Sequence, residues 1–92
     1  MMTGIIVTNG VTAVAPINTN RTWAIIENID LNPIFFQLGN TSSGLTITNG
    51  LELVAGGIVS LTKSSPLSDF GFSINAISSV VSGVNIRYQD DT

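Results

Sequence analysis

The feature that most constrains the fold is a series of short segments rich in Val, Ile and Thr, each ended within a few residues by Gly, Pro, Asn or Ser. Helix-forming residues do not recur at the spacing of three or four that would place them on one helical face. Breaks roughly every 8–12 residues between β-rich segments are typical of a small sandwich or barrel. A chain of 92 residues can enclose one hydrophobic core but not two. We therefore predict a single all-β domain over residues 1–92, a small antiparallel β-sandwich or barrel-like fold of about seven to nine short strands.

The expected strands lie between these breaks. In chain order they are residues 4–8, 11–15, 22–28, 34–38, 45–48, 51–54, 58–63, 74–80 and 84–88. The segment 22–28 is apolar on both faces, which predicts a central strand. In the last segment Val84, Ile86 and Tyr88 alternate with polar residues and are expected to point inward.

Two segments share one phrase: GIIVTNGVTAVA at residues 4–15 and GLTITNGLELVA at residues 44–55. Asn-Gly between two apolar arms is the strongest short-range hairpin signal, because both residues tolerate the positive φ of a type I′ turn. The sequence therefore predicts two hairpins, the first of them an N-terminal hairpin or arm over residues 1–16. The repeat is explained either by a pseudo-symmetry or by independent selection of the same turn chemistry, and the turn chemistry favours the second.

The chain has no cysteine and no histidine, so it lacks the usual metal ligands and the usual general base near neutral pH. Glu27 is interpreted either as one member of an ion pair with Arg21 or Arg87 or as an outward-facing charge, rather than as a catalytic carboxylate. Asp30 opens a segment with the spacing of a calcium loop, but Pro33 follows and no glutamate closes it, so an Asx-type turn is expected. We therefore expect a non-enzymatic protein with no catalytic residue, no metal and no cofactor.

Charged residues make up only 10% of the chain, and the net charge is −3. This composition argues against nucleic-acid binding, which needs clustered Lys and Arg. No apolar run reaches the ~20 residues of a membrane span. The polar remainder is mainly Asn, Ser, Thr and Gly, so the surface is either covered in a permanent assembly or is the neutral surface of a monomer. Weak protection against association favours the assembly.

Some apolar residues are expected to contact a partner rather than fill the core. Trp23 and Phe36 fall on apolar strand faces and are expected inside, whereas Phe35 should point outward beside Gln37. An exposed aromatic residue in a charge-poor surface favours contact with another chain. The candidate interface residues come from the N-terminal arm, this strand and a long connection, and they are Ile5, Ile6, Val7, Phe35, Phe70 and Phe72.

Four phrases occur in a fixed order, followed by a last strand over residues 84–88. They are NRTWAIIEN (20–28), NPIFFQLG (32–39), LELVAGG (51–57) and INAISS (74–79). In this order they resemble small β-sandwich proteins encoded among the structural genes of tailed bacteriophages. The chain departs from that pattern at Ala55, where the family often has Pro, and in two additions, residues 45–50 and the segment before Asn20.

The resemblance implies a virion component: a head decoration (cement) protein, a head-fibre base or a minor tail part. We expect a decoration protein on the capsid surface, made in the host cytoplasm, that binds the major capsid protein lattice. It should self-associate, with a homotrimer favoured because quasi-three-fold capsid sites suit one. Arg21 is then expected to be structural, with its guanidinium paired with a carboxylate or capping strand carbonyls. The alternative is a tail or fibre component that binds carbohydrate, which requires an exposed Trp23 or Tyr88 beside Asn or Asp groups.

Overall fold

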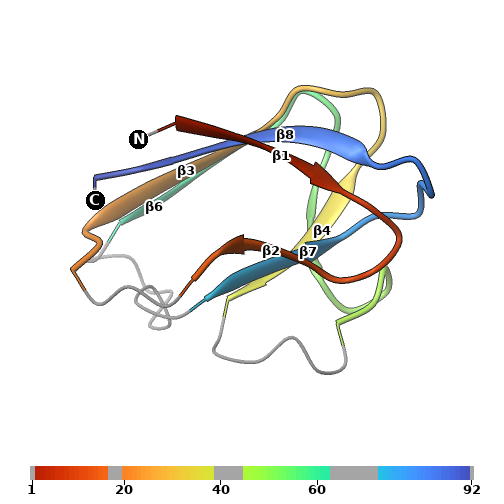
Figure 1. The fold of residues 1–92 in the computed structure, drawn as a ribbon, viewed down its shortest axis with the longest axis horizontal. Coiled ribbons are helices and arrows are strands. Elements are labelled where there is room, and N and C mark those ends of the chain that lie inside the picture. The colour runs from red at the N-terminus through yellow and green to blue at the C-terminus, as the bar shows by residue number, and fades with distance from the viewer. Residues whose placement is uncertain (1, 17–19, 39–44, 63–72, 92) are drawn as a thin grey trace.

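The computed structural model describes residues 2–16, 20–38, 45–62 and 73–91, and these form two four-stranded antiparallel sheets without a helix (Figure 1). The first sheet, called sheet A, has the order β1 (Met2–Val7), β8 (Val84–Asp90), β3 (Trp23–Asn28), β6 (Ile58–Thr62). The second, sheet B, has the order β2 (Thr12–Ala15), β7 (Ile74–Ile77), β4 (Ile34–Leu38), β5 (Leu51–Leu53). The sheets are not closed into a barrel, so the all-β sandwich prediction is confirmed.

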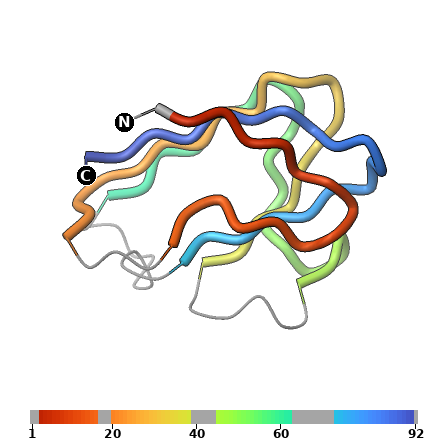
Figure 2. Tube along the Cα trace, viewed as in Figure 1, coloured from red at the N-terminus to blue at the C-terminus, as the bar shows by residue number. Residues whose placement is uncertain are grey.

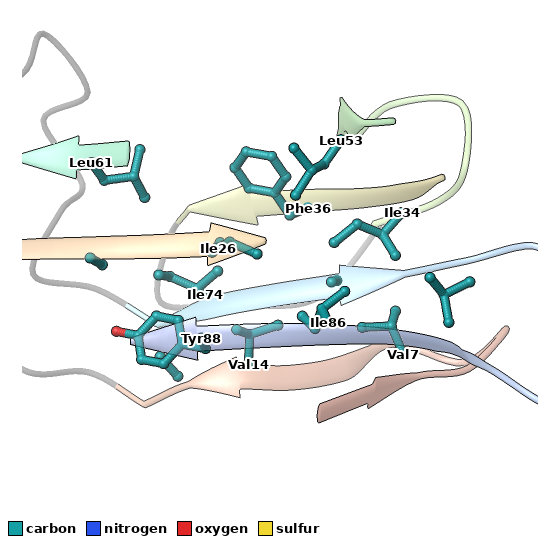
Figure 3. Close-up of a cluster of buried hydrophobic side chains, with 14 residues drawn as sticks. Val7, Val14, Ile26, Ile34, Phe36, Leu53, Leu61, Ile74, Ile86 and Tyr88 are labelled. Atoms are coloured by element: carbon teal, nitrogen blue, oxygen red, sulfur yellow. The ribbon is translucent and has the colours of Figure 1, made fainter. Parts of the chain in front are cut away.

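Every strand contributes at least one apolar side chain to the core between the sheets (Figure 3). Val84, Ile86 and Tyr88 are buried while the residues between them are exposed or partly exposed, as the alternation predicted. Ile26, at the centre of sheet A, and Ile34, in sheet B, have no exposed surface. Burying this apolar area, at about 25 cal/mol per Å², is the main favourable term in folding.

β3 is a central strand, as its two apolar faces predicted, because it pairs with β8 on one side and β6 on the other. Its inward residues Ala24 and Ile26 are fully buried. Its outward residues, Trp23, Ile25 and Glu27, are half-buried. On this face Ile25 lies in register between Ser60 of β6 and Gln89 of β8, and cross-strand neighbours of this kind partly shield an outward side chain.

The first Asn-Gly does not form the hairpin predicted over residues 1–16. β1 belongs to sheet A and β2 to sheet B, so the chain crosses between the sheets at residues 8–11 (Figure 2). Among the described residues positive φ occurs only at Gly56 and Gly83, so Asn9 and Gly10 do not adopt a type I′ turn. Each arm instead pairs with a distant strand, β1 with β8 and β2 with β7. Long-range pairing has overridden the local turn preference.

The second Asn-Gly is also not a hairpin turn. Residues 45–48, predicted to be a strand, lead into a turn in which the N–H groups of Asn49 and Gly50 both lie 3.3 Å from the carbonyl oxygen of Thr46. The Asn49 side-chain oxygen accepts a hydrogen bond from the Thr46 N–H at 2.7 Å. Asn49 thus satisfies locally a backbone group that a strand would pair across a sheet. Leu45 is buried, yet it lies outside the main core cluster.

Candidate interaction surface

Four connections gather at one end of the sandwich, at the right-hand side of Figure 1 and away from both termini. We call this the loop end; it consists of residues 8–11, 29–33, 54–57 and 78–83. Asp30 is the only charged residue within these four connections. No helix in the described part of the chain is long and apolar enough to cross a membrane. No group of three or more potential metal-ligating acidic side chains occurs among the described residues.

Each connection of the loop end presents at least one aliphatic side chain to solvent. Leu31 is 89% exposed and Val81 is 76% exposed, whereas Val54 and Val11 are 56% and 42% exposed. Large aliphatic side chains that stay in solvent singly are ordinary, but a group of them at one end of a domain indicates a contact surface.

The buried side chain of Asn28 ties two of these connections together. Its Nδ2 donates to the carbonyl oxygens of Asn32, at 2.8 Å, and Leu53, at 3.1 Å. Its Oδ1 accepts from the N–H of Asp30 at 3.0 Å. Its backbone N–H donates to the Gly57 carbonyl, also across the two connections. These hydrogen bonds therefore hold residues 29–33 and 54–57 together, and with them the connections that carry Leu31 and Val54.

Asp30 fixes the same connection to β8. Its Oδ2 accepts hydrogen bonds from the backbone N–H of Asn85, at 3.0 Å, and from Asn85 Nδ2, at 2.9 Å, and its Oδ1 accepts from the N–H of Leu31. These bonds, the backbone bond of Asn85 first, hold the pKa of the Asp30 carboxyl below its usual value. The bond from Leu31 spans only one residue, so the Asx-type turn predicted at Asp30 is not formed there; Asn28 makes it instead, since its Oδ1 accepts from the N–H two residues on. The loop end therefore carries a charge that is already hydrogen-bonded.

The other two connections are joined by Ser78. Its N–H donates to the Thr8 carbonyl at 2.9 Å, and its Oγ donates to the Val7 carbonyl at 2.8 Å. Gly83 ends the β7–β8 connection with φ of 98°, and its N–H donates to the Val80 carbonyl. A Cβ on Gly83 would lie 2.2 Å from Ile6 Cγ2, so only glycine fits there without rearrangement. The tip that carries Val81 is thus anchored on both sides.

A shallow groove of about 530 Å³ borders the loop end on the outer face of sheet A. Gly4 and Ile6 of β1, Ile29 and Asp30 of the β3–β4 connection, and Asn85 and Arg87 of β8 form most of its lining. Arg87 Nη1 lies 3.9 Å from Glu27 Oε1, which confirms the ion-pair interpretation of Glu27. The groove is therefore apolar along β1 and polar along β8.

The predicted interface residues have different positions in the fold. Val7 is fully buried, whereas Ile5 is partly buried against the core and also lines the groove. Ile6 is 55% exposed and borders the loop end. Phe35 points outward as expected, but it is half-buried with Gly50 close against it. Phe70 and Phe72 lie outside the described residues.

Sequence reasoning missed Leu31, Val54 and Val81. Each is an aliphatic residue next to turn-forming residues, in the phrases DLNP, LVAGG and VVSG. A residue in such a turn has no strand partner to bury it. An aliphatic residue inside a turn phrase was therefore the signal that could have identified the loop end.

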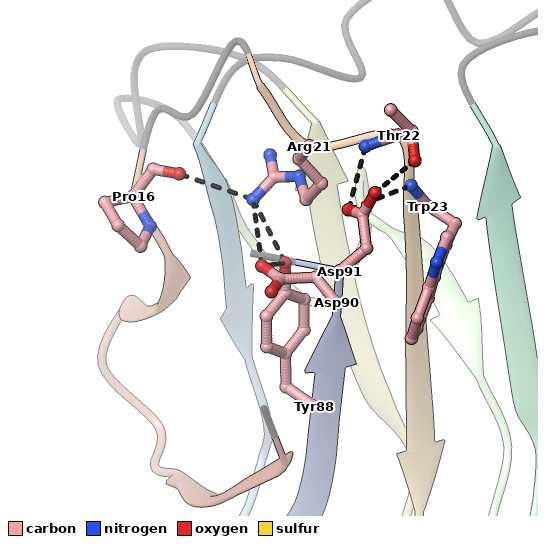
Figure 4. A network of polar contacts seen from close by, with 7 residues as sticks. All are labelled: Pro16, Arg21, Thr22, Trp23, Tyr88, Asp90 and Asp91. Atoms are coloured by element: carbon pink, nitrogen blue, oxygen red, sulfur yellow. Dashed lines mark hydrogen bonds and ion pairs between the residues drawn. The ribbon is translucent and has the colours of Figure 1, made fainter.

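The opposite end of the sandwich is closed by a polar network (Figure 4). Arg21, only 1% exposed, donates from Nη1 to the Tyr88 hydroxyl at 3.0 Å and lies 4.0 Å from Asp90. The Tyr88 hydroxyl donates to Asp90 Oδ2 at 2.8 Å. Burial, and then this bond to Asp90, raise the pKa of Tyr88 to about 12. The expectation that Arg21 pairs with a carboxylate is confirmed.

Two acidic residues, Asp90 and Asp91, stand at the end of β8 and directly after it, and both are held by hydrogen bonds. Asp91 accepts hydrogen bonds from the N–H groups of Thr22, at 2.9 Å, and Trp23, at 3.4 Å, and from the Thr22 hydroxyl. The Thr22 hydroxyl is the first cause of a lowered pKa of Asp91. A sugar site would need an exposed Trp23 or Tyr88; Tyr88 is buried, and only the half-buried Trp23 reaches the surface.

Comparisons of this chain with protein-family models, with curated proteins and with solved structures each gave no match.

Proposed function

We propose that this chain is a non-enzymatic virion structural protein, a decoration (cement) protein that binds the major capsid protein lattice of a tailed bacteriophage through its loop end. The resemblance of residues 20–88 to phage structural proteins suggests the class. The observation that carries the proposal is the rigid, charge-poor and aliphatic loop end. The capsid surface is then its place of action, and binding there does not depend on whether the protein self-associates.

The loop end suits a permanent contact because its connections are already ordered, so binding costs little additional conformational entropy. Its connections are already fixed by the hydrogen bonds of Asn28, Asp30 and Ser78. Burying one exposed aliphatic side chain contributes roughly 1.5–3 kcal/mol. Part of that gain offsets the loss of translational and rotational freedom on association, about 4–15 kcal/mol. Leu31 and Val81, the most exposed of the group, are expected to contribute most.

Quantitative mass spectrometry of purified particles, measured against the major capsid protein, tests the class of function. Hundreds of copies per particle are expected for a protein that occupies a capsid lattice. A handful of copies would instead favour the tail or fibre alternative with a carbohydrate-binding role. Absence from the particle would overturn the virion proposal.

A second experiment tests the loop end itself. Leu31→Asp and Val81→Asp place a carboxylate at each exposed tip and should reduce the copies bound to particles lacking the protein by at least about ten-fold, which corresponds to roughly 1.4 kcal/mol. Ile47→Asp is the matched control, because Ile47 is 43% exposed on a turn outside the loop end. Binding equal to that of the control would show that another surface contacts the capsid.

A further inference from the structure

β1 is an edge strand without the features that usually protect an edge. It pairs with β8 alone and without a register shift from Met2 to Val7. Its sequence, MTGIIV, contains no charge and no proline. Natural sheets block free edges with charges, prolines, bulges or very short strands, because an open edge pairs with other chains.

Two of the other three edges carry such a feature. β2 has a register shift between Ala13 and Ala15. β5 has only three residues and includes Glu52. β6 (Ile58–Thr62) also contains no charge and no proline, and it is one residue shorter than β1. Among the described strands β1 is therefore the longest edge without such a feature.

The hydrogen bonds of β8 show which backbone groups of β1 point toward β8 and which point to the open edge. The N–H of Asn85 donates to Asp30 and its carbonyl accepts from Ile29, so both groups of Asn85 point toward β3. Backbone groups alternate in direction along a strand, so those of Val84, Ile86 and Tyr88 point toward β1. Their register partners, Val7, Ile5 and Thr3, face β8 in return. The N–H and C=O groups of the remaining residues point to the open edge, and these residues are Met2, Gly4 and Ile6.

We infer that β1 pairs with β1 of a second copy of this chain in an antiparallel, two-fold arrangement centred on Gly4. In that register Gly4 faces its own counterpart and Met2 faces the partner's Ile6, so every outward-pointing group finds a partner. The two copies of sheet A become one continuous sheet. The contact is isologous and closes as a dimer. It replaces the trimer expected from sequence, and it is independent of the proposed capsid function.

A second copy is the occupant because the strand is compatible with itself. No charge lies in residues 2–7, so no like charges face each other across the two-fold axis. Gly4 has no atom within 4 Å of a Cβ position, which leaves the centre of the contact open. The nearest charge in register is Arg87, opposite Gly4, and it is already paired with Glu27.

Gly4→Lys tests the contact and fits the monomer sterically, because open space surrounds the new Cβ. The new charge lies opposite Arg87 of β8, so the stability of the variant monomer has to be measured as well. The substitution places two ammonium groups opposite each other at the two-fold axis. Ser60→Lys is the matched control, since it adds the same charge to an exposed position on β6, the other edge of sheet A. The mass in solution is measured by sedimentation over a range of concentrations, and thermal unfolding confirms that each variant is folded.

The parent chain and Ser60→Lys should form a species of twice the 9.6 kDa chain mass, whereas Gly4→Lys should be a folded monomer. A parent chain that stays monomeric at every concentration, or a trimer, would overturn the inference. So would a Gly4→Lys variant that still forms dimers, because the contact would then lie elsewhere.

Cysteine substitution tests the register. The chain has no cysteine of its own. Directly opposed residues of a hydrogen-bonded antiparallel pair have Cα atoms about 5.5 Å apart, within the span of a disulfide. Oxidised Gly4→Cys should therefore give a covalent dimer, and Ser60→Cys should not. Equal cross-linking of both would refute pairing centred on Gly4. Neither measurement involves a phage particle, so failure here would leave the proposed function standing.

Discussion

Replacing Asn28 by alanine should destabilise the protein far more than its place at the end of a strand suggests. The Asn28 side chain has no exposed surface and takes part in three hydrogen bonds, to Asn32, Leu53 and Asp30. Alanine would remove all three and leave two carbonyl oxygens and one N–H without these partners, partly or fully buried. Those groups would have to find water or move.

The magnitude follows from these contacts. A hydrogen bond contributes about 0.5–1.5 kcal/mol net, and a buried group left without a partner costs more. Three bonds therefore give a loss of roughly 2–4 kcal/mol in the free energy of unfolding. For a domain of this size 1 kcal/mol shifts the melting temperature by about 4–8 °C, so a decrease of roughly 10–30 °C is expected.

Chemical and thermal denaturation of Asn28→Ala would be compared with Asn85→Ala. Asn85 is the matched control, because its exposed side chain donates one hydrogen bond, to Asp30. Asn28→Asp adds a second test: a carboxylate cannot donate to the two carbonyls, so this variant should recover stability relative to Asn28→Ala as the pH falls and the carboxyl is protonated. A loss in Asn28→Ala no larger than that in Asn85→Ala would refute the reasoning.

Three further outcomes are expected. Gly83→Ala should lower the free energy of unfolding by about 1–3 kcal/mol, since φ at this position is 98° and the new Cβ would meet Ile6. The control is Gly10→Ala, which should leave the melting temperature unchanged because the atom nearest to its new Cβ is 3.9 Å away. Equal effects of the two substitutions would contradict the steric argument. The folded-state pKa of Tyr88 is raised to about 12, so its contribution to the free energy of unfolding is complete below about pH 10 and falls by roughly 2–3 kcal/mol toward pH 12. The stability of Tyr88→Phe should lack this decrease in alkaline denaturation, and an unchanged decrease would contradict the prediction. The pKa of Asp91 is lowered in the folded protein, so its contribution to the free energy of unfolding is complete above about pH 4 and is lost as the pH falls through the folded-state pKa. Asp91→Asn should therefore lose less stability than the parent chain on acidification. Identical stability curves for the two proteins would exclude this contribution.

The strands could be predicted from the sequence because alternation is a local property. Ile34 and Phe36 point inward, as do Val84 and Ile86, since side chains on a strand change face at every residue. The turn at residues 55–57 was equally readable: Gly56 adopts the positive φ that glycine permits, and the Gly57 N–H closes the turn on Val54.

The candidate site was less accessible from the sequence. Ile6 was identified, but Val7 beside it proved to be core, because the inward face of β1 is set by its pairing with β8. Leu31 and Val81 became visible as surface residues only when the connections that carry them were seen at the same end. Asp91 could not be assigned either, since its partners lie 68 and 69 positions away in the chain.

By itself the sequence determined an all-β chain with eight of its nine expected strand segments, most of their inward faces and a charge-poor composition, because these follow from residue type and period. Only the tertiary structure decided that the two Asn-Gly phrases are not hairpins, which sheet each strand joins and that four connections meet at one end. The physical reason is that strand pairing depends on partners distant in the chain. β1 pairs along β8 rather than folding back on β2, and residues next to each other in the sequence do not determine which of these two pairings is the more stable.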